Sequence, residues 1–460
     1  MAEDQIHRRP RVLIVGGGFA GTHAAKALAR LPVDITVIDR SNHFTFQPLL
    51  YQVGLAVLSP ADIASPLRTM LRHSSSTEVI MDEAIGFDLP SRRVRLRSGA
   101  EFAYDYLMLA TGATHSYFGH DEWAPLAPGL KTIEDAIEIR RRILLSFELA
   151  EREMLENGTH PPLNFVIIGG GPTGVELAGA ICDISRHYMR HDFRHIDPAM
   201  ARVILIEGEK HVLATYPEEL SIKAEEQLRA LGAEVHTGLR VTALEPGVVV
   251  AGDQRIPAAV TLWAAGVQAS PLGKLLGVPT DKRGCVLVNA TLNPPDHPEI
   301  FVCGDLAHVE ENGHHIPGVA QPAMQMGDHI ARMIEADLNH RPRPPFHYFD
   351  KGDMSTIGRL AAVAKVEWPF KARWSGFLAW ITWLVVHIYF LIGFRNRLAV
   401  LWQWVWSYFT FTYGVRLIYG SQALPGWTTQ AGADMHPDSH PIDLTAPGAS
   451  QNPSKPAAAD

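Results

Sequence analysis

The chain has 460 residues, of which 47% are hydrophobic and 20% are charged, and its formal net charge is −8. This length predicts two or three domains, and the composition excludes a disordered chain and a basic nucleic-acid binder. The cysteines Cys182, Cys285 and Cys303 are too few for a disulfide framework, and without a C-x-x-C pair we expect no metal centre. No apolar segment precedes the first predicted strand, so we expect a chain that stays in the cytoplasm.

The first predicted unit is a strand, a glycine-rich turn and a helix. Residues 11–15 and 33–38 are short apolar strands around a helical stretch at 20–31, and residues 16–21 read GxGxxG. The glycines allow a tight turn and bring backbone amides close to a pyrophosphate. Asp39 ends the second strand 23 residues after the first glycine, where a carboxylate accepts hydrogen bonds from ribose hydroxyls. The unit predicts a dinucleotide site; the alternative is an ordinary strand–helix turn.

The same pattern returns about 150 residues later. Strands at 164–168 and 202–206 enclose a helix from about residue 172 to 185, and residues 169–174 again read GxGxxG. Glu207 ends the second strand, 38 residues after the first glycine, and we attribute the extra length to a polar helical insertion at 183–201. A glutamate at this position accepts from a 2′-hydroxyl and repels a 2′-phosphate, which favours NADH over NADPH. Two such units predict an α/β fold with two Rossmann-like dinucleotide-binding domains.

The C-terminal part has a different composition. Eight of the ten tryptophans lie at or beyond Trp368, no Asp or Glu occurs between residues 368 and 432, and the 21 residues 374–394 carry no charge. At 1.5 Å per residue this stretch would reach about 30 Å, so its length permits one membrane span. Small residues on one face favour packing against protein instead: Ser375, Ala379, Thr382, Val386 and Gly393.

Residues 398–416 predict an amphipathic helix at a membrane surface. Its polar stripe is Gln403, Ser407, Thr410 and Gly414, and its aromatic stripe is Trp402, Trp406, Phe409 and Tyr413. Cations flank the region without acids between them, namely Lys371, Arg373, Arg395, Arg397 and Arg416. They would attract anionic lipid headgroups, so monotopic attachment is favoured over a span at 374–394. The alternative is a buried C-terminal core or a dimer interface.

Further motifs resemble a known superfamily of flavoproteins. With the two glycine turns, the Ala-Thr-Gly turn at 110–112 and Phe-Val-Cys-Gly-Asp at 301–305 resemble the flavoproteins with two dinucleotide-binding domains. The resemblance implies that the first turn holds FAD non-covalently, that the second holds NADH, and that Asp305 contacts the ribityl-phosphate region of the flavin. Asp305 as a helix N-cap is the compatible alternative.

Longer strings narrow the resemblance to type II NADH dehydrogenases, the single-subunit, non-proton-pumping NADH:quinone oxidoreductases of respiratory membranes. They lie at 46–52 (FQPLLYQ), 169–178 (GGGPTGVELA), 263–267 (WAAGV), 320–325 (AQPAMQ) and 383–397 (WLVVHIYFLIGFRNR), within a resemblance that covers about residues 10–420. This implies hydride transfer from NADH to flavin N5 and two-electron reduction of a membrane quinone, without an iron–sulfur cluster. It also implies attachment to the cytoplasmic face of the inner membrane, with lipid and quinone as partners and no nucleic acid. Ubiquinone and menaquinone stay open, as does a homodimer.

Two other functions stay open. A sulfide:quinone oxidoreductase shares the fold and the acceptor, but it needs paired redox cysteines, and the spacing of the three cysteines offers no obvious pair. An NADH-sensing flavoprotein with little turnover is the alternative from another functional class.

Three residues are candidates for the chemistry. Gln321 and Gln325 lie four residues apart, so their amides project from one helix face; by resemblance this face lies beside the flavin at the quinone site. A helix cap or a hydrogen bond to flavin O2 or N3 is the alternative. By resemblance Glu176 faces the nicotinamide and the flavin and gates charge transfer or relays a proton; the alternative is a carboxylate that complements the helix dipole.

The remaining candidates bind cofactor or substrate. The FAD candidates are Gly16, Gly18, Phe19, Ala20, Gly21, Asp39, Arg40, Ala110, Thr111, Gly112, Asp305, Ala320 and Gln321. The NADH candidates are Gly169, Gly171, Pro172, Thr173, Gly174, Glu176, Glu207, Ala265 and Gly266. We expect the FAD domain at 1–160 and 286–345, the NADH domain at 161–285, a membrane-anchoring region at 346–427 and a disordered tail at 428–460.

Overall fold

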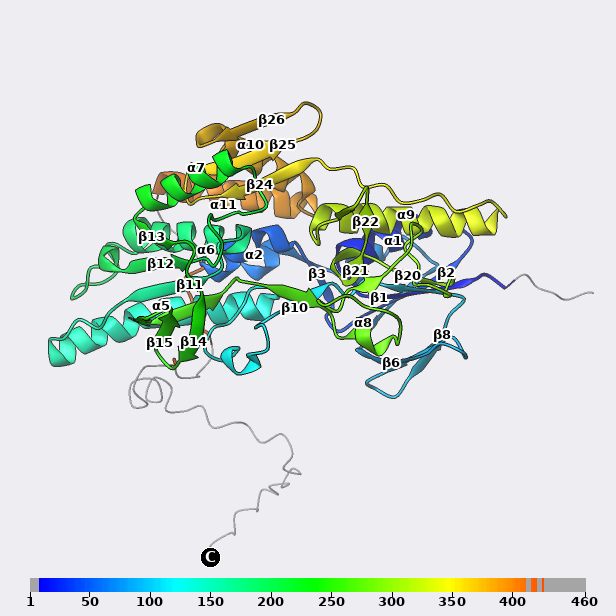
Figure 1. Cartoon of the computed structure of the whole chain (residues 1–460), viewed down its shortest axis with the longest axis horizontal. Coiled ribbons are helices and arrows are strands. Elements are labelled where there is room, and N and C mark those ends of the chain that lie inside the picture. Colours follow the sequence, from blue (N-terminus) through cyan, green and yellow to red (C-terminus); the bar gives the residue numbers. More distant parts are fainter. Residues whose placement is uncertain (1–7, 411–414, 420–423, 426–460) are drawn as a thin grey trace, which may run out of the picture.

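Two parallel β-sheets form the centre of the protein (Figure 1). The computed structural model describes residues 8–410, 415–419 and 424–425. The first sheet has the order β20-β9-β1-β2-β5 and the second the order β13-β12-β11-β17. The first consists of Ile300–Val302 (β20), Tyr106–Leu109 (β9), Arg11–Val15 (β1), Asp34–Asp39 (β2) and Thr77–Met81 (β5). The second consists of Ala233–His236 (β13), Arg202–Ile206 (β12), Asn164–Ile168 (β11) and Val260–Trp263 (β17). The predicted α/β fold with two dinucleotide-binding sheets is confirmed.

Two helices cover one face of the first sheet. α1 (Phe19–Leu28) and α9 (Ala320–Leu338) lie side by side although about 300 residues separate them (Figure 1). They approach closely because residue 327 is glycine, where a Cβ atom would overlap the carbonyl oxygen of Ala20. This contact brings the start of α9 to the first glycine-rich turn.

Three helices accompany the second sheet: α5 (Ile133–Asn157), α6 (Pro172–Asp183) and α7 (Glu218–Ala230). The predicted helical insertion at 183–201 is wrong beyond residue 188. α6 continues only into a π-helical turn at Ile184–Tyr188, and a 3₁₀ turn at Pro198–Met200 precedes β12. Between them, the Glu151 carboxylate accepts hydrogen bonds from the backbone N–H groups of residues 194–196. A side chain thus provides the acceptor that a helical carbonyl would otherwise supply.

Short antiparallel elements join and flank the two sheets. β10 (Ala113–His115) pairs with β18 (Val267–Ala269) and crosses between the halves of the molecule. Beside the first sheet stand β6 (Ala84–Asp88), β7 (Arg93–Leu96) and β8 (Glu101–Ala103). Beside the second stand β14 (Val241–Glu245), β15 (Val248–Ala251) and β16 (Gln254–Pro257). The segment after β2 contains β3 (His43–Thr45), α2 (Leu50–Gly54), α3 (Pro60–Ile63), β4 (Ala64–Pro66) and α4 (Leu67–Leu71).

The C-terminal part is a three-stranded sheet followed by two helices. The elements are β24 (Gly352–Thr356), β25 (Ala362–Val366), β26 (Ala372–Ser375), α10 (Phe377–Phe390) and α11 (Phe394–Thr410). Residues 374–394 are therefore not one helix, so the prediction that Ser375 and Gly393 share a helix face with Ala379 is wrong. Gly376 has a φ of 75° before α10, and Leu391 is extended after it. In the described part of the chain, no helix is long and apolar enough to cross a membrane.

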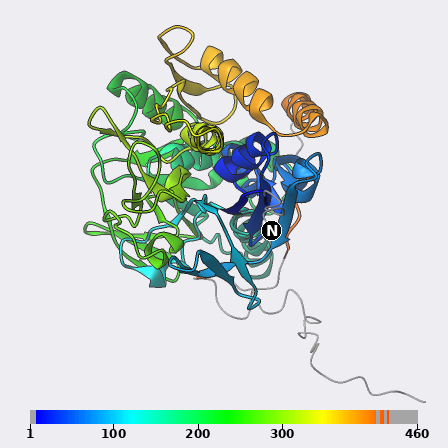
Figure 2. The same cartoon turned by 90° about the vertical axis from the view of Figure 1, so that its right-hand side faces the viewer.

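The two sides of α11 differ in what they contact. Ser407 of the polar stripe is buried, and Gln403 Nε2 donates to Asp62 Oδ2 of α3 at 3.1 Å. The aromatic stripe residues Trp402, Trp406 and Phe409 are exposed. Figure 2 shows α10 and α11, in orange, together on one side of the molecule. Tyr413, Gly414 and the predicted tail at 428–460 lie outside the described residues.

Candidate functional site

The first glycine-rich turn lies at the carboxyl ends of β1, β2 and β9. Gly16 has a φ of 108°, and a Cβ atom there would overlap the carbonyl of Ala110, so the two turns touch. Asp39 Oδ2 accepts from the N–H of Gly17 at 2.6 Å, and its Oδ1 accepts from the N–H of Ser41 at 2.7 Å. Each oxygen keeps a lone pair for a ribose hydroxyl. A Cβ at Gly18 would meet no atom within 4 Å, which leaves an open cradle at this turn.

The other FAD candidates gather at the same edge of the sheet. Phe19, Ala20 and Gly21 open α1, and Arg40 is exposed directly after Asp39. Thr111 Oγ1 is buried without a hydrogen-bond partner between Ala110 and Gly112. This orphaned hydroxyl and the open cradle fit a polar cofactor such as FAD.

Asp305 and the start of α9 are the last of the FAD candidates. The turn at Gly304–Leu306 lies against α9, where the Cβ position of Gly304 is 3.4 Å from Ala323 Cβ. Cys303, not Asp305, occupies the N-cap position of this turn. Asp305 Oδ2 lies 3.7 Å from Lys131 Nζ, a half-buried pair. Sequence reasoning missed Lys131, because it stands in the loop before α5 and belongs to no motif.

The second glycine-rich turn repeats the geometry at the carboxyl end of β11. Gly169 has a φ of 107°, and a Cβ atom there would lie 2.5 Å from the backbone nitrogen of Ala265. Glu207 Oε2 accepts from the N–H of Gly170 at 2.5 Å, and its Oε1 accepts from the N–H of Glu209 at 2.8 Å. Gly171 is open, and Pro172, Thr173 and Gly174 form the first turn of α6. The arrangement fits an NADH pyrophosphate at the helix N-terminus.

Gly266 packs against an aromatic ring that the sequence did not indicate. A Cβ atom at Gly266 would lie 2.7 Å from Phe118 Cζ. Phe118 is exposed and has a φ of 54°, which is unusual for a bulky side chain. Phe118 therefore leaves no room for a side chain at 266, and the nicotinamide contact of Gly266 stays a prediction.

Glu176 lies on α6. Burial raises the pKa of its carboxyl to about 8, and the N–H of Thr356 offsets part of this rise. In the described ranges Glu176 forms no ion pair. It faces two tyrosines, Tyr51 and Tyr216, whose pKa values rise mainly through burial and also through the charge of Glu176. A carboxyl that holds a proton at neutral pH gains little from a helix dipole, so the acid-base interpretation is favoured.

Gln321 and Gln325 both project from α9 toward residues 349–352, but their bonding differs. Gln321 Nε2 donates to the carbonyl of Gly352 at 2.8 Å, and its Oε1 is buried without a partner. Gln325 Nε2 donates to the carbonyl of Phe349 at 3.0 Å, and its Oε1 accepts from the Phe349 N–H at 2.9 Å. Gln321 therefore retains a free acceptor, whereas both ends of the Gln325 amide are occupied by one backbone unit.

An aromatic contact links the first half of the molecule to α10. The Phe46 ring lies 6.3 Å from the ring of His387, which stacks on Trp383 at 4.1 Å. His387 Nδ1 donates to the carbonyl of Trp383 at 2.7 Å, and burial lowers the pKa of His387 to about 4. The imidazole is therefore neutral near pH 7, with Nε2 as an acceptor.

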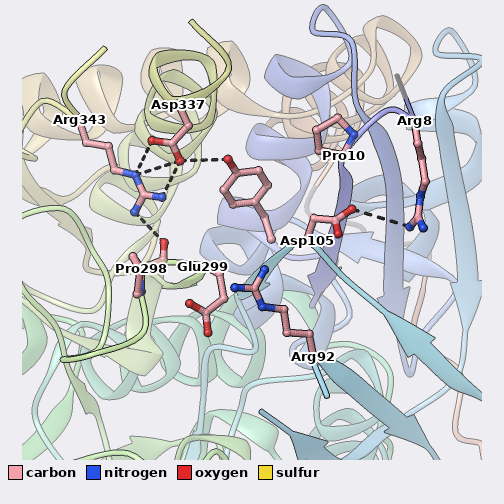
Figure 3. A pocket seen from close by; sticks show the side chains of 9 residues that line it. Arg8, Pro10, Arg92, Asp105, Pro298, Glu299, Asp337 and Arg343 are labelled. Carbon is pink, nitrogen blue, oxygen red and sulfur yellow. Dashed lines mark hydrogen bonds and ion pairs between the residues drawn. The ribbon is translucent and has the colours of Figure 1, made fainter. Parts of the chain in front are cut away.

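The three cysteines and one surface pocket lie outside this chemistry. Cys182, Cys285 and Cys303 are free, buried thiols. The pocket in Figure 3 lies at the amino ends of β1, β9 and β20, opposite the glycine turns. Its Arg343 donates to Asp337, which also accepts from the Tyr106 hydroxyl. The polar groups of Arg343, Asp337 and Tyr106 are thus hydrogen-bonded to one another.

Comparison with known proteins defines the class to which this site belongs. Residues 10–327 match the pyridine nucleotide-disulphide oxidoreductase family, and the chain belongs to it. The chain is 41% identical over 434 residues to the type II NADH:quinone oxidoreductase Ndh of Mycobacterium tuberculosis, covering 91% of this chain and 92% of that protein. It is 42% identical over 413 residues to NdhA of the same organism, with 86% of each chain covered. Within its class, the chain belongs to the type II NADH:quinone oxidoreductases.

Solved structures agree on the fold. NDH2 from Plasmodium falciparum in complex with NADH superposes with a TM-score of 0.79 at 18% identity, covering 90% of this chain and all of that one. The sulfide:quinone oxidoreductase of Aquifex aeolicus gives a TM-score of 0.68 at 20% identity. At these identities the likeness concerns architecture alone.

Proposed function

We propose that this chain binds FAD and NADH at its two glycine turns and transfers two electrons from NADH to a quinone. The observation that carries this proposal is the repeated geometry of Asp39 and Glu207, whose carboxylates accept from the N–H groups of Gly17 and Gly170, the middle glycine of each Gly-Gly-Gly run. FAD, when bound, supplies a ring that accepts hydride from NADH and passes the electrons on. The protein orients the two ligands and excludes water.

The FAD side consists of the first turn, the 110–112 turn and Asp305. Asp39 would accept from the ribose, and the open backbone at Gly18 would receive the pyrophosphate at the start of α1. We assign Asp305 to the ribityl-phosphate region, where Lys131 balances its charge. On the NADH side, Glu207 would take the adenosine ribose, and Ala265 and Gly266 would line the nicotinamide path.

The quinone contact is assigned to Gln321. Its free Oε1 suits a donor, such as the flavin N3–H or a quinol hydroxyl, while one hydrogen of its amide nitrogen is left over after the bond to Gly352. Gln325 is assigned a supporting role because it holds the Phe349 backbone. Phe46 and the neutral His387 would form the apolar wall through which a quinone enters from α10.

Membrane attachment is proposed for the face formed by α10 and α11. Phe377, Leu378, Val385, Trp402 and Trp406 are exposed on it, and Lys371 and Arg395 provide cations for anionic headgroups. We place this face on the cytoplasmic side of the inner membrane, in monotopic attachment. We also propose domain boundaries at residues 160, 285, 345 and 427. A homodimer through part of this face would appear as a doubled mass in light scattering.

The function is tested with FAD-loaded protein under anaerobic conditions. NADH is expected to bleach the flavin absorbance near 450 nm, and a short-chain quinone is expected to restore it over many cycles. Flavin that bleaches but stays reduced with quinone would contradict the proposal and favour an NADH sensor. Flavin that is bleached by sulfide and not by NADH would move the assignment to a sulfide:quinone oxidoreductase.

The preference for NADH is expected to depend on Glu207. In Glu207→Gln the repulsion of a 2′-phosphate is lost, so the ratio of kcat/KM for NADH over NADPH should fall about tenfold or more. Glu209→Gln is the matched control, because Glu209 is exposed two residues away. An unchanged ratio in Glu207→Gln, measured by steady-state kinetics with both nucleotides, would contradict this role.

A further inference from the structure

The glycine that opens β24 is held from two sides by side chains. Gly352 is buried, and its carbonyl oxygen accepts from Gln321 Nε2 at 2.8 Å. Its N–H donates to Asp350 Oδ1, also at 2.8 Å. Both directions are fixed, because a carbonyl oxygen only accepts and a backbone N–H only donates. One backbone residue therefore joins the carboxylate of Asp350 to the amide of Gln321.

The backbone of Gly352 has little freedom to move. Its φ is 106°, and a Cβ atom there would lie 2.0 Å from the carbonyl oxygen of Lys365 on β25. Gly352 stands opposite Val366, and in the neighbouring pair the N–H of Glu367 donates to the carbonyl of Lys351. Bonded and non-bonded pairs alternate along an antiparallel ladder, so the N–H and C=O of Gly352 point away from β25. They are thus available to side chains on the other side.

The carboxylate of Asp350 uses its two oxygens differently. Oδ1 accepts from the Gly352 N–H, and Oδ2 lies 3.5 Å from Lys365 Nζ. The same cation lies 4.0 Å from Asp353 Oδ2 and 3.3 Å from Glu367 Oε1. Since the Asp350 side chain is 40% exposed, its ion pair contributes little, and the bond to the buried Gly352 is the contact with structural consequences.

We propose that Asp350 is a positioning residue for quinone reduction, because it fixes the backbone of Gly352 and Gly352 fixes the amide of Gln321. The inference rests on the proposed function, in which Gln321 contacts the quinone. One amide hydrogen of Gln321 is used for Gly352, so the directions of its other hydrogen and of Oε1 depend on where that carbonyl stands. A displaced carbonyl turns the amide away from the quinone, and small displacements of an aligned group slow a reaction strongly.

Three substitutions of Asp350 separate its hydrogen bond from its charge. Asp350→Asn keeps an oxygen for the Gly352 N–H and loses the charge. Asp350→Glu keeps the charge, but its longer side chain does not form the turn to the N–H two residues on, which Asp and Asn form. Asp350→Ala loses both. The matched control is Asp353→Ala, because Asp353 is 42% exposed and also faces Lys365, while the Gly352 N–H is bonded to Asp350.

We expect kcat/KM for a short-chain quinone to fall about fivefold in Asp350→Ala and Asp350→Glu, the effect of one ordinary hydrogen bond. Flavin reduction by NADH should be unchanged. Asp350→Asn and Asp353→Ala should stay within about twofold of the wild-type protein. In a Gln321→Ala background, Asp350→Ala should cause no further fall, because its effect passes through the amide that is already removed. If Asp350→Ala does not retain FAD, Asp350→Glu carries the test.

Hydrogen exchange at the Gly352 amide gives a readout that does not depend on turnover. Measured by mass spectrometry on the FAD-loaded proteins, it should be about fivefold faster in Asp350→Ala and unchanged in Asp350→Asn and Asp353→Ala. Gln321→Ala should also accelerate it, because the carbonyl of the same residue loses its donor.

Four results would overturn the inference. They are an impaired Asp350→Asn beside an active Asp350→Glu, an equal loss of quinone reduction in Asp353→Ala, a full additional loss from Asp350→Ala in the Gln321→Ala background, and unchanged exchange at Gly352 in Asp350→Ala. If the wild-type protein reduces no quinone, the proposed function fails, but hydrogen exchange still decides whether Asp350 and Gln321 hold the same backbone residue.

Discussion

Gly21→Ala is expected to yield a protein with little FAD, whereas Gly174→Ala is expected to retain FAD and to react poorly with NADH. The added Cβ would overlap the carbonyl oxygen of Gly16 in the first variant and that of Gly169 in the second. Both obstacles are backbone atoms within the same turn, so the turn itself must shift. Overpacking of this kind costs about 1–3 kcal/mol, which lowers the affinity for the ligand about 10- to 100-fold.

Each variant is the control for the other. The FAD content of the purified proteins is read from the ratio of flavin to protein absorbance, and the NADH reaction from the rate of flavin bleaching as NADH is varied. For Gly174→Ala we expect normal flavin content and a half-saturating NADH concentration about 10- to 100-fold higher. Full FAD content in Gly21→Ala, or loss of FAD in Gly174→Ala, would contradict the assignment of one nucleotide to each turn.

Gln321→Ala is expected to slow the quinone half-reaction and to leave flavin reduction by NADH nearly unchanged. The Nε2 hydrogen that is not used for Gly352 can donate to a quinone carbonyl, and Oε1, which lacks a partner, can accept from the quinol hydroxyl that forms. Removal of a polar group that bonds a substrate in a buried site typically costs about 1–3 kcal/mol. We therefore expect kcat/KM for quinone to fall about 10- to 100-fold.

Gln325→Ala is the matched control, from the same helix face and the same residue type. Its two hydrogen bonds to Phe349 are structural, so the expected loss is in the free energy of unfolding, by about 1 kcal/mol for each bond. Stopped-flow measurement of both half-reactions, with thermal unfolding of each protein, separates the two roles. An equal loss of quinone reduction in both variants would refute the distinction between them.

The short strand–turn–helix units of this protein could be predicted from its sequence. A strand, GxGxxG, a helix and a carboxylate at the next strand end are set by neighbouring residues, so β1, α1, β11 and α6 occur close to where the pattern placed them. The helical position of Gln321 and Gln325 also followed from their spacing. Such features depend on backbone geometry and short-range periodicity, which a sequence records directly.

Which distant residues contact one another depends on long-range packing. No sequence motif indicates that Lys131 pairs with Asp305, or that Phe118 packs on Gly266. The break of residues 374–394 at Gly376 arose because Trp374 pairs into a sheet with β25, and composition cannot show that pairing. Likewise, the difference between Gln321 and Gln325 depends on their contacts with the segment that leads into β24, where Gln321 bonds Gly352 and Gln325 bonds Phe349. Long-range packing selects partners among chemically similar groups, and this selection is absent from local sequence patterns.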